Sequence, residues 1–252
     1  MFTDPWFYLV SVPAVLLYGI AKGGFGGAIA IISVPLMALV MPPTQAAAIL
    51  LPILVVMDAL VVKTYWGVFD RKALLILLPG ALVGVGIGYA SADAMNEHYM
   101  RILIGLLSLV FGIQYLLGWK SFAGREHHPV SGSLFGTLAG FTSFSIHAGG
   151  PPLTMYLMPK QLPPLLFAGT AGIFFAVVNL VKLVPYYVLD QFTTDNLLYS
   201  LVLVPLAPLG VKLGHYLVRR STSSFYYSVV SIALVGVGIK LLWDGIAALH
   251  VA

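Results

Sequence analysis

Two short glycine-rich segments combine residue types that could bind an anion. The first, KGGFGG at residues 22–27, joins a lysine to four glycines, and the second, SIHAGGPP at 145–152, joins a serine and a histidine to two glycines and two prolines. Glycine lets the backbone approach a ligand closely and adopt positive φ. Where such a segment begins a new helix, its free N–H groups and the positive end of the helix dipole favour negative charge. The two segments therefore predict a site for a small anion.

This hypothesis names a set of substrate-binding residues and predicts no catalytic residue, no metal and no cofactor. Structural alternatives remain open: glycine pairs permit close helix packing in membranes, and Lys22 could snorkel from a shallow segment. His147 could be a hydrogen-bonded structural residue, and Pro151 is well placed to begin a helix. The predicted binding residues are Lys22, Gly23, Gly24, Gly26, Gly27, Ser145, His147, Gly149 and Gly150.

Asp58 and Asn179 are the candidate polar groups beside this site. An acid inside an apolar segment points to function by default, here as a proton-coupling group or as a partner for Lys22. A structural pairing of Asp58 with Lys63 is the alternative. Asn179 lies at a comparable place in the second half of the chain, where its amide could hold substrate or hydrogen-bond between helices.

Four other polar residues are expected to have structural roles. Lys182, Lys212 and His215 lie near the ends of apolar runs, so we expect their side chains to snorkel toward the membrane surface. Gln114 is expected to hydrogen-bond between helices.

The elements around these residues are predicted to be membrane-spanning helices. The 252 residues are 60% hydrophobic and 9% charged, whereas a soluble domain carries about 25% charged residues. Apolar runs fill the chain, so we expect a single membrane domain over 1–252. The net charge of +4 therefore does not indicate nucleic-acid binding. The absence of cysteine excludes disulfides and thiolate metal sites.

Six runs are long enough to cross a hydrocarbon core, which takes roughly 20 helical residues. Two further stretches, 6–40 and 131–159, are each interrupted by one of the glycine-rich segments. We expect each of these to be a hairpin that enters and leaves by the same membrane face. The predicted spans are 43–64, 73–91, 98–118, 163–187, 194–217 and 224–243.

The distribution of Lys and Arg orients these spans. With the loop at 63–72 in the cytoplasm, eight basic residues fall inside and three fall outside, as the positive-inside rule requires. Both termini are then predicted to lie outside. The inner group is Lys63, Arg71, Lys72, Lys120, Arg125, Lys160, Arg219 and Arg220, and the outer group is Arg101, Lys182 and Lys240.

The two halves of the chain show matching glycines and prolines. Three spans follow each hairpin, and because three is odd the second half begins on the opposite face. We therefore expect an all-α polytopic membrane protein with an inverted repeat, an architecture that many secondary transporters share. Repeat one covers 5–118, a cytoplasmic linker covers 119–130, and repeat two covers 131–248. The aligned pairs are Gly26-Gly27 with Gly149-Gly150, Pro79 with Pro205, Gly84 with Gly210, Gly88 with Gly214 and Gly112 with Gly238.

At these residues the chain resembles the TauE/SafE family of sulfite and organosulfur anion exporters. The resemblance covers nearly the whole chain, and it implies a multi-pass secondary transporter of the bacterial inner membrane that moves sulfite, sulfonates or related sulfur oxyanions. The segments that carry it are GIAKGGFGGAIAIISVPLMALVMPPTQAAAILLPILVVMD (19–58), LLPGALVGVGIG (77–88), GFTSFSIHAGGPPLTMYLMP (140–159), AGTAGIFFAVVNLVKLVPYY (168–187) and LAPLGVKLGHYLVRR (206–220).

The leading functional hypothesis is therefore export of a small anion by alternating access, with the bilayer as environment and protons as the candidate coupling ion. The sequence contains no G-x-x-x-x-G-K-[ST] motif, so ATP use by this chain is not expected. An anion channel or a lipid-phosphate translocase using the same pocket is the alternative. An intramembrane hydrolase using Ser145 and His147 is disfavoured, because residues two apart on a helix point to different sides and no G-x-S-x-G motif is present.

Overall fold

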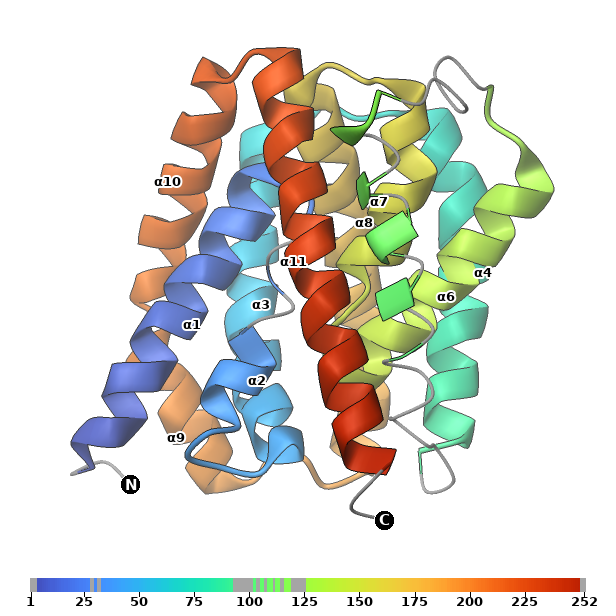
Figure 1. Cartoon of the computed structure of the whole chain (residues 1–252). Coiled ribbons are helices and arrows are strands. Elements are labelled where there is room, and N and C mark those ends of the chain that lie inside the picture. The colour runs from blue at the N-terminus through green and yellow to red at the C-terminus, as the bar shows by residue number, and fades with distance from the viewer. Residues whose placement is uncertain are drawn as a thin grey trace.

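The computed structural model describes residues 4–27, 30, 33–92, 102, 105–106, 108–110, 112–113, 116–118 and 126–249, and every regular element in these ranges is helical. Figure 1 shows the chain beginning and ending at the same end of the molecule. The helices are α1 (Pro5–Gly24), α2 (Ser33–Met37), α3 (Pro43–Tyr65), α4 (Arg71–Ala90), α6 (Pro129–Ile146), α7 (Gly150–Leu157), the 3-10 helix η2 (Met158–Lys160), α8 (Pro164–Val188), α9 (Thr194–Leu203), α10 (Leu206–Arg220) and α11 (Ser223–Leu249).

Five of these helices are long and apolar enough to cross a membrane, namely α1, α3, α4, α8 and α11. A sixth candidate is the pair α9 and α10, which is bent by 48° at a short break. Spans were predicted at the positions of α3, α4, α8 and α11, and each is confirmed as a helix there, whereas the span predicted at 194–217 is formed by two helices, α9 and α10. About half of the span predicted at 98–118 lies outside the described residues, as do Gln114 and the linker residues 119–125.

The two helices of the first interrupted stretch differ in length within the described residues. Its first arm, α1, has 20 residues and carries Lys22 and two glycines in its last turn, whereas α2 has only 5 residues. The second stretch has the same asymmetry, with 18 residues in α6 and 8 in α7. The last turn of α1 is buried against other helices, where helical backbone bonds satisfy the main chain.

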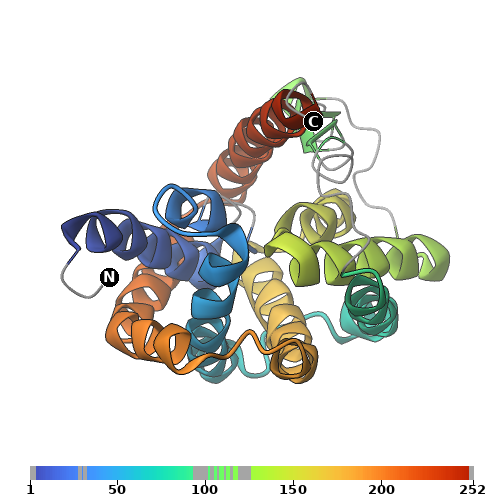
Figure 2. The same cartoon turned by 90° about the horizontal axis from the view of Figure 1, so that it is seen from below.

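Pairs of helices from different halves of the chain pack closely through glycine. On one side, α4 lies along α6, and on the other, α10 lies along α1, with α3 and α8 between them (Figure 2). A Cβ built on Gly84 of α4 would lie 2.1 Å from the carbonyl oxygen of Thr137, and one built on Gly214 of α10 would lie 2.3 Å from that of Ile20. In the first half, α4 thus packs on α6, the first helix of the second half. In the second half, α10 packs on α1, the first helix of the first half. The inverted repeat itself stays a prediction, which this exchange supports.

A pair of substitutions on α4 tests the role of these crossings. Gly84→Ala should lower the free energy of unfolding by about 1–3 kcal/mol, because the added methyl group overpacks the contact with α6. Gly86→Ala is the matched control, because no atom lies within 4 Å of a Cβ built there. Thermal unfolding in detergent measures both. Equal midpoints for the two variants would contradict the close-packing role of Gly84.

Candidate functional site

Each glycine-rich segment starts in the last turn of a helix, and a residue in the left-handed conformation follows that helix. At the end of α1, Gly26 has φ of 60°, and the N–H groups of Phe25 and Gly27 donate to the carbonyl oxygen of Ala21 at 2.8 and 3.2 Å. At the end of α6, His147 has φ of 52°, and the N–H of Ala148 donates to the carbonyl oxygen of Thr142 at 3.0 Å. Glycine adopts this conformation freely, whereas histidine adopts it at a cost.

Two tyrosines hold these helix ends in the same way. The hydroxyl of Tyr65 donates to the carbonyl oxygen of Gly23 at 2.6 Å, and that of Tyr186 donates to the carbonyl oxygen of Phe144 at 3.1 Å. In each case the tyrosine follows its acceptor by 42 residues. The last carbonyl groups of a helix lack intrahelical partners, so both bonds satisfy buried backbone at an interrupted helix.

The two bends, which follow α1 and α6, lie against each other. A Cβ built on Gly27 would be 3.8 Å from the Cα of Gly150. The ring of Phe175, from α8, would contact a Cβ on Gly27 at 3.1 Å and one on Gly149 at 2.9 Å. The chain therefore brings the two glycine-rich segments to one place. Their depth in the bilayer, and so the expected midplane position, stays a prediction.

A buried ion pair lies beside the first bend. The ammonium group of Lys22 donates to one carboxylate oxygen of Asp58 on α3, and the carbonyl oxygen of Leu54 lies 3.5 Å from it. The other carboxylate oxygen accepts from the side-chain amide of Asn179 on α8 at 2.7 Å. All three side chains are buried. Of the two partners considered for Asp58, the structure pairs it with Lys22 and not with Lys63.

Lys182 joins this cluster, and the expectation that it snorkels is wrong. Its side chain is 0% exposed. Its ammonium donates to the carbonyl oxygen of Ser143 at 2.6 Å and to Nδ1 of His147 at 2.7 Å, and it lies 3.5 Å from Oδ1 of Asn179. The error came from judging Lys182 by its distance from the span end. Asn179, Lys182 and Tyr186 follow each other at three and four residues, which places them on one helix face and could have revealed the cluster.

Both ring nitrogens of His147 have hydrogen-bond partners. With Lys182 as an ammonium, which can only donate, Nδ1 accepts from it and carries no hydrogen. Nε2 then bears the hydrogen and donates to the carbonyl oxygen of Ala47 on α3 at 3.1 Å. The ring also stacks on Tyr186, with centroids 6.1 Å apart. The neutral imidazole thus holds the bend of α6 against α3 and α8.

Ser145 and two of the predicted glycines have other contacts. The hydroxyl of Ser145 donates to the carbonyl oxygen of Phe141 at 2.8 Å, one turn back on α6. The hydroxyl near the cluster is that of Ser143, 3.3 Å from the Lys182 ammonium. Gly23 and Gly24 lie against α10, because a Cβ on either would be 2.3 Å from a carbonyl oxygen of that helix. These two glycines therefore serve the α1–α10 crossing.

The amide donors available to an anion differ between the two bends. At the first bend, the N–H groups of Phe25 and Gly27 are already bonded to α1. At the second, Gly150 begins α7 and the prolines at 151 and 152 have no N–H, so the donors at this helix start belong to Gly149 and Gly150. The second bend is thus the better place for an anion among the described residues.

The charges of the cluster do not balance. Lys22 has a carboxylate partner, whereas none of the ion pairs found in the described part of the chain includes Lys182. Its ammonium is held only by neutral acceptors. A buried charge that lacks an opposite charge is costly, so an anion beside Lys182 would complete the site electrostatically.

Long apolar helices that enclose an ion pair and a further lysine define a polytopic membrane protein with charged residues buried between its helices. A sequence model of the family described as sulfite exporter TauE/SafE matches residues 11–241. The chain therefore belongs to the TauE/SafE sulfite exporter family, and with it to the membrane transporters. Searches of curated proteins and of solved structures give no match.

The buried pair can be tested through stability. Asp58→Asn leaves the Lys22 ammonium without its carboxylate and should lower the free energy of unfolding by about 3–5 kcal/mol. The double variant Lys22→Met/Asp58→Asn should be more stable than Asp58→Asn, because no unpaired charge remains. Asp244→Asn is the control, since it removes the carboxylate of the partly exposed Lys240–Asp244 pair, worth about 0–1 kcal/mol. A double variant no more stable than Asp58→Asn would contradict the pairing.

Proposed function

We propose that this protein is a secondary transporter that exports a small oxyanion, of the sulfite or organosulfonate type, across the bacterial inner membrane. Membership of a family of sulfite exporters supports the class of substrate. The observation that carries the proposal is Lys182, a buried cation that is held by neutral acceptors beside two adjoining helix bends.

The substrate would bind where Lys182 meets the second bend. One oxygen of the anion would accept from the Lys182 ammonium in place of Nδ1 of His147, and the amides of Gly149 and Gly150 would supply further donors. An ammonium and an anion oxygen attract each other through their opposite charges, most strongly where the site is buried and the effective dielectric constant is low. Replacing the neutral acceptor Nδ1 of His147 by an anion oxygen therefore favours binding, and it leaves that nitrogen free to accept another bond.

Alternating access would use the packing already described. The glycine-lined pairs α4–α6 and α1–α10 are close enough to move as units. The bends at Gly26 and His147, and the break between α9 and α10, are the positions where backbone angles can change with the fewest helical bonds lost. Rocking of these units about α3 and α8 would expose the site to one side and then to the other, as in other repeat-built transporters.

Asp58 is the proposed proton-coupling group. Protonation of its carboxylate would cancel its attraction for Lys22, and Lys22 could then join Lys182 in binding the anion. Proton binding and anion binding would thus favour each other.

The coupling proposal predicts a change in pH dependence. In proteoliposomes, flux driven by a proton gradient should be lost in Asp58→Asn, while exchange of labelled sulfite at equal pH on both sides persists. Asp244→Asn should keep the wild-type pH profile, because this acid lies on α11 away from the cluster. An Asp58→Asn profile that matches the wild type would exclude Asp58 as the coupling group.

The site proposal predicts loss of anion binding. Lys182→Gln should weaken sulfite binding in detergent by about 10-fold or more, because removing a hydrogen bond to a charged group costs about 1.5–3 kcal/mol. Lys22→Met should weaken it as well if Lys22 reaches the anion. Lys240→Gln, at a partly exposed position on α11, is the matched control.

Unchanged affinity in Lys182→Gln would remove this residue from the pocket. Sulfite flux that rises linearly with concentration and never saturates would favour the channel alternative, and transfer of labelled undecaprenyl phosphate across liposomes would favour a lipid-phosphate translocase.

A further inference from the structure

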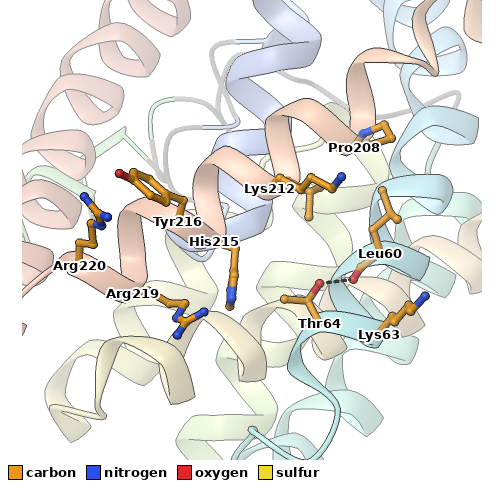
Figure 3. A pocket seen from close by; sticks show the side chains of 10 residues that line it. Leu60, Lys63, Thr64, Pro208, Lys212, His215, Tyr216, Arg219 and Arg220 are labelled. Atoms are coloured by element: carbon orange, nitrogen blue, oxygen red, sulfur yellow. Dashed lines mark hydrogen bonds between the residues drawn. The ribbon is translucent and has the colours of Figure 1, made fainter.

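A cavity of about 750 Å³ lies between α3 and α10, apart from the bends. Figure 3 shows its lining side chains, with His215 and Arg219 pointing from α10 toward the end of α3 that carries Thr64. Five of the lining residues are basic and none is acidic: Lys63, Lys212, His215, Arg219 and Arg220. The ends of α3 and α10 beside it are those that the charge distribution predicts to be cytoplasmic.

The basic groups of this cavity are not neutralised within the described part of the protein. The ion pairs found there are Lys22–Asp58, His127–Asp70 and Lys240–Asp244, and none of them lines the cavity. The guanidinium of Arg220 lies 4.3 Å from the ring centre of Tyr216, which leaves its N–H groups available to a ligand. Nδ1 of His215 is buried and has no hydrogen-bond partner there. A buried polar atom without a partner is uncommon in native structures.

The cavity is distinct from the Lys22–Lys182 cluster. The ring of His215 packs edge-on against Tyr65, with centroids 5.1 Å apart. On its other side, the hydroxyl of Tyr65 donates to the carbonyl oxygen of Gly23. Tyr65 therefore contacts both His215 of the cavity and the end of α1, and no residue lines the cavity and also belongs to the cluster.

We propose that this cavity is a second anion site, which binds a tetrahedral oxyanion group of the phosphate or sulfate class. Five basic groups around one concavity concentrate a positive potential, and guanidinium groups match such oxygens with paired N–H donors. His215 Nδ1 would supply or accept one more bond. The group could arrive on an anionic phospholipid, because basic pockets between cytoplasmic ends of helices bind lipid head groups, or as a free ion.

The test uses the whole protein in neutral detergent with four probes: sodium sulfate, inorganic phosphate, short-chain phosphatidylglycerol and, as the neutral lipid, phosphatidylcholine. Calorimetry measures the ions at constant ionic strength, and native mass spectrometry counts bound lipids. Lys212→Gln/Arg219→Gln should weaken anion binding by about 10-fold or more. Arg71→Gln/Lys72→Gln removes the same charge from the exposed start of α4, and it should bind as the wild type does.

Each outcome decides the proposal. Selective loss of phosphatidylglycerol, or of sulfate and phosphate, in the cavity variant supports the site and identifies the source of the oxyanion. Equal affinities in the wild type and both variants, or equal losses in both variants, would overturn it. Repeating the titration with Lys182→Gln separates this proposal from the transport site, because binding in the cavity should persist when binding in the cluster is lost.

Discussion

The contact between Lys22 and Asp58 is the constraint on which the centre of this protein depends. Each charge costs several kcal/mol to bury alone, so α1 can end inside the helical bundle only where a carboxylate meets its lysine. The second oxygen of Asp58 then binds Asn179, which ties α1, α3 and α8 together. A broken helix end, with its unsatisfied backbone, is tolerated because these three helices enclose it.

The glycine crossings and the charged cluster support each other. Close approach of α10 to α1 and of α4 to α6 leaves α3 and α8 in contact at the middle, where the polar side chains of the two helices face each other. Tyr65 and Tyr186 then bond to the last carbonyl groups of α1 and α6 in equivalent ways. This equivalence is the strongest support for the proposed duplication, because it rests on equivalent hydrogen bonds to the backbone as well as on matching residue types.

Two groups of basic residues differ in their surroundings. Around the bends, Lys22 is paired with a carboxylate and Lys182 is held by neutral acceptors, and all of these groups are buried. Between α3 and α10, the basic groups line an open cavity without an acidic neighbour. In both groups, basic residues outnumber acidic ones among the described residues.

Composition and hydropathy by themselves determined the class of protein and most of its helices, because burial in lipid demands long apolar runs that any reader of the chain can find. They also singled out Lys22, Asp58, Asn179 and His147 as polar residues where polarity is costly. Only the tertiary structure decided which of these touch. It placed Lys182 inside the cluster. It also placed the hydroxyl of Ser143, and not that of Ser145, beside Lys182, and it packed Gly23 and Gly24 against another helix. Spacing along one helix gives the face of a residue, whereas partners depend on how helices cross, and crossing is set by packing between segments far apart in the chain.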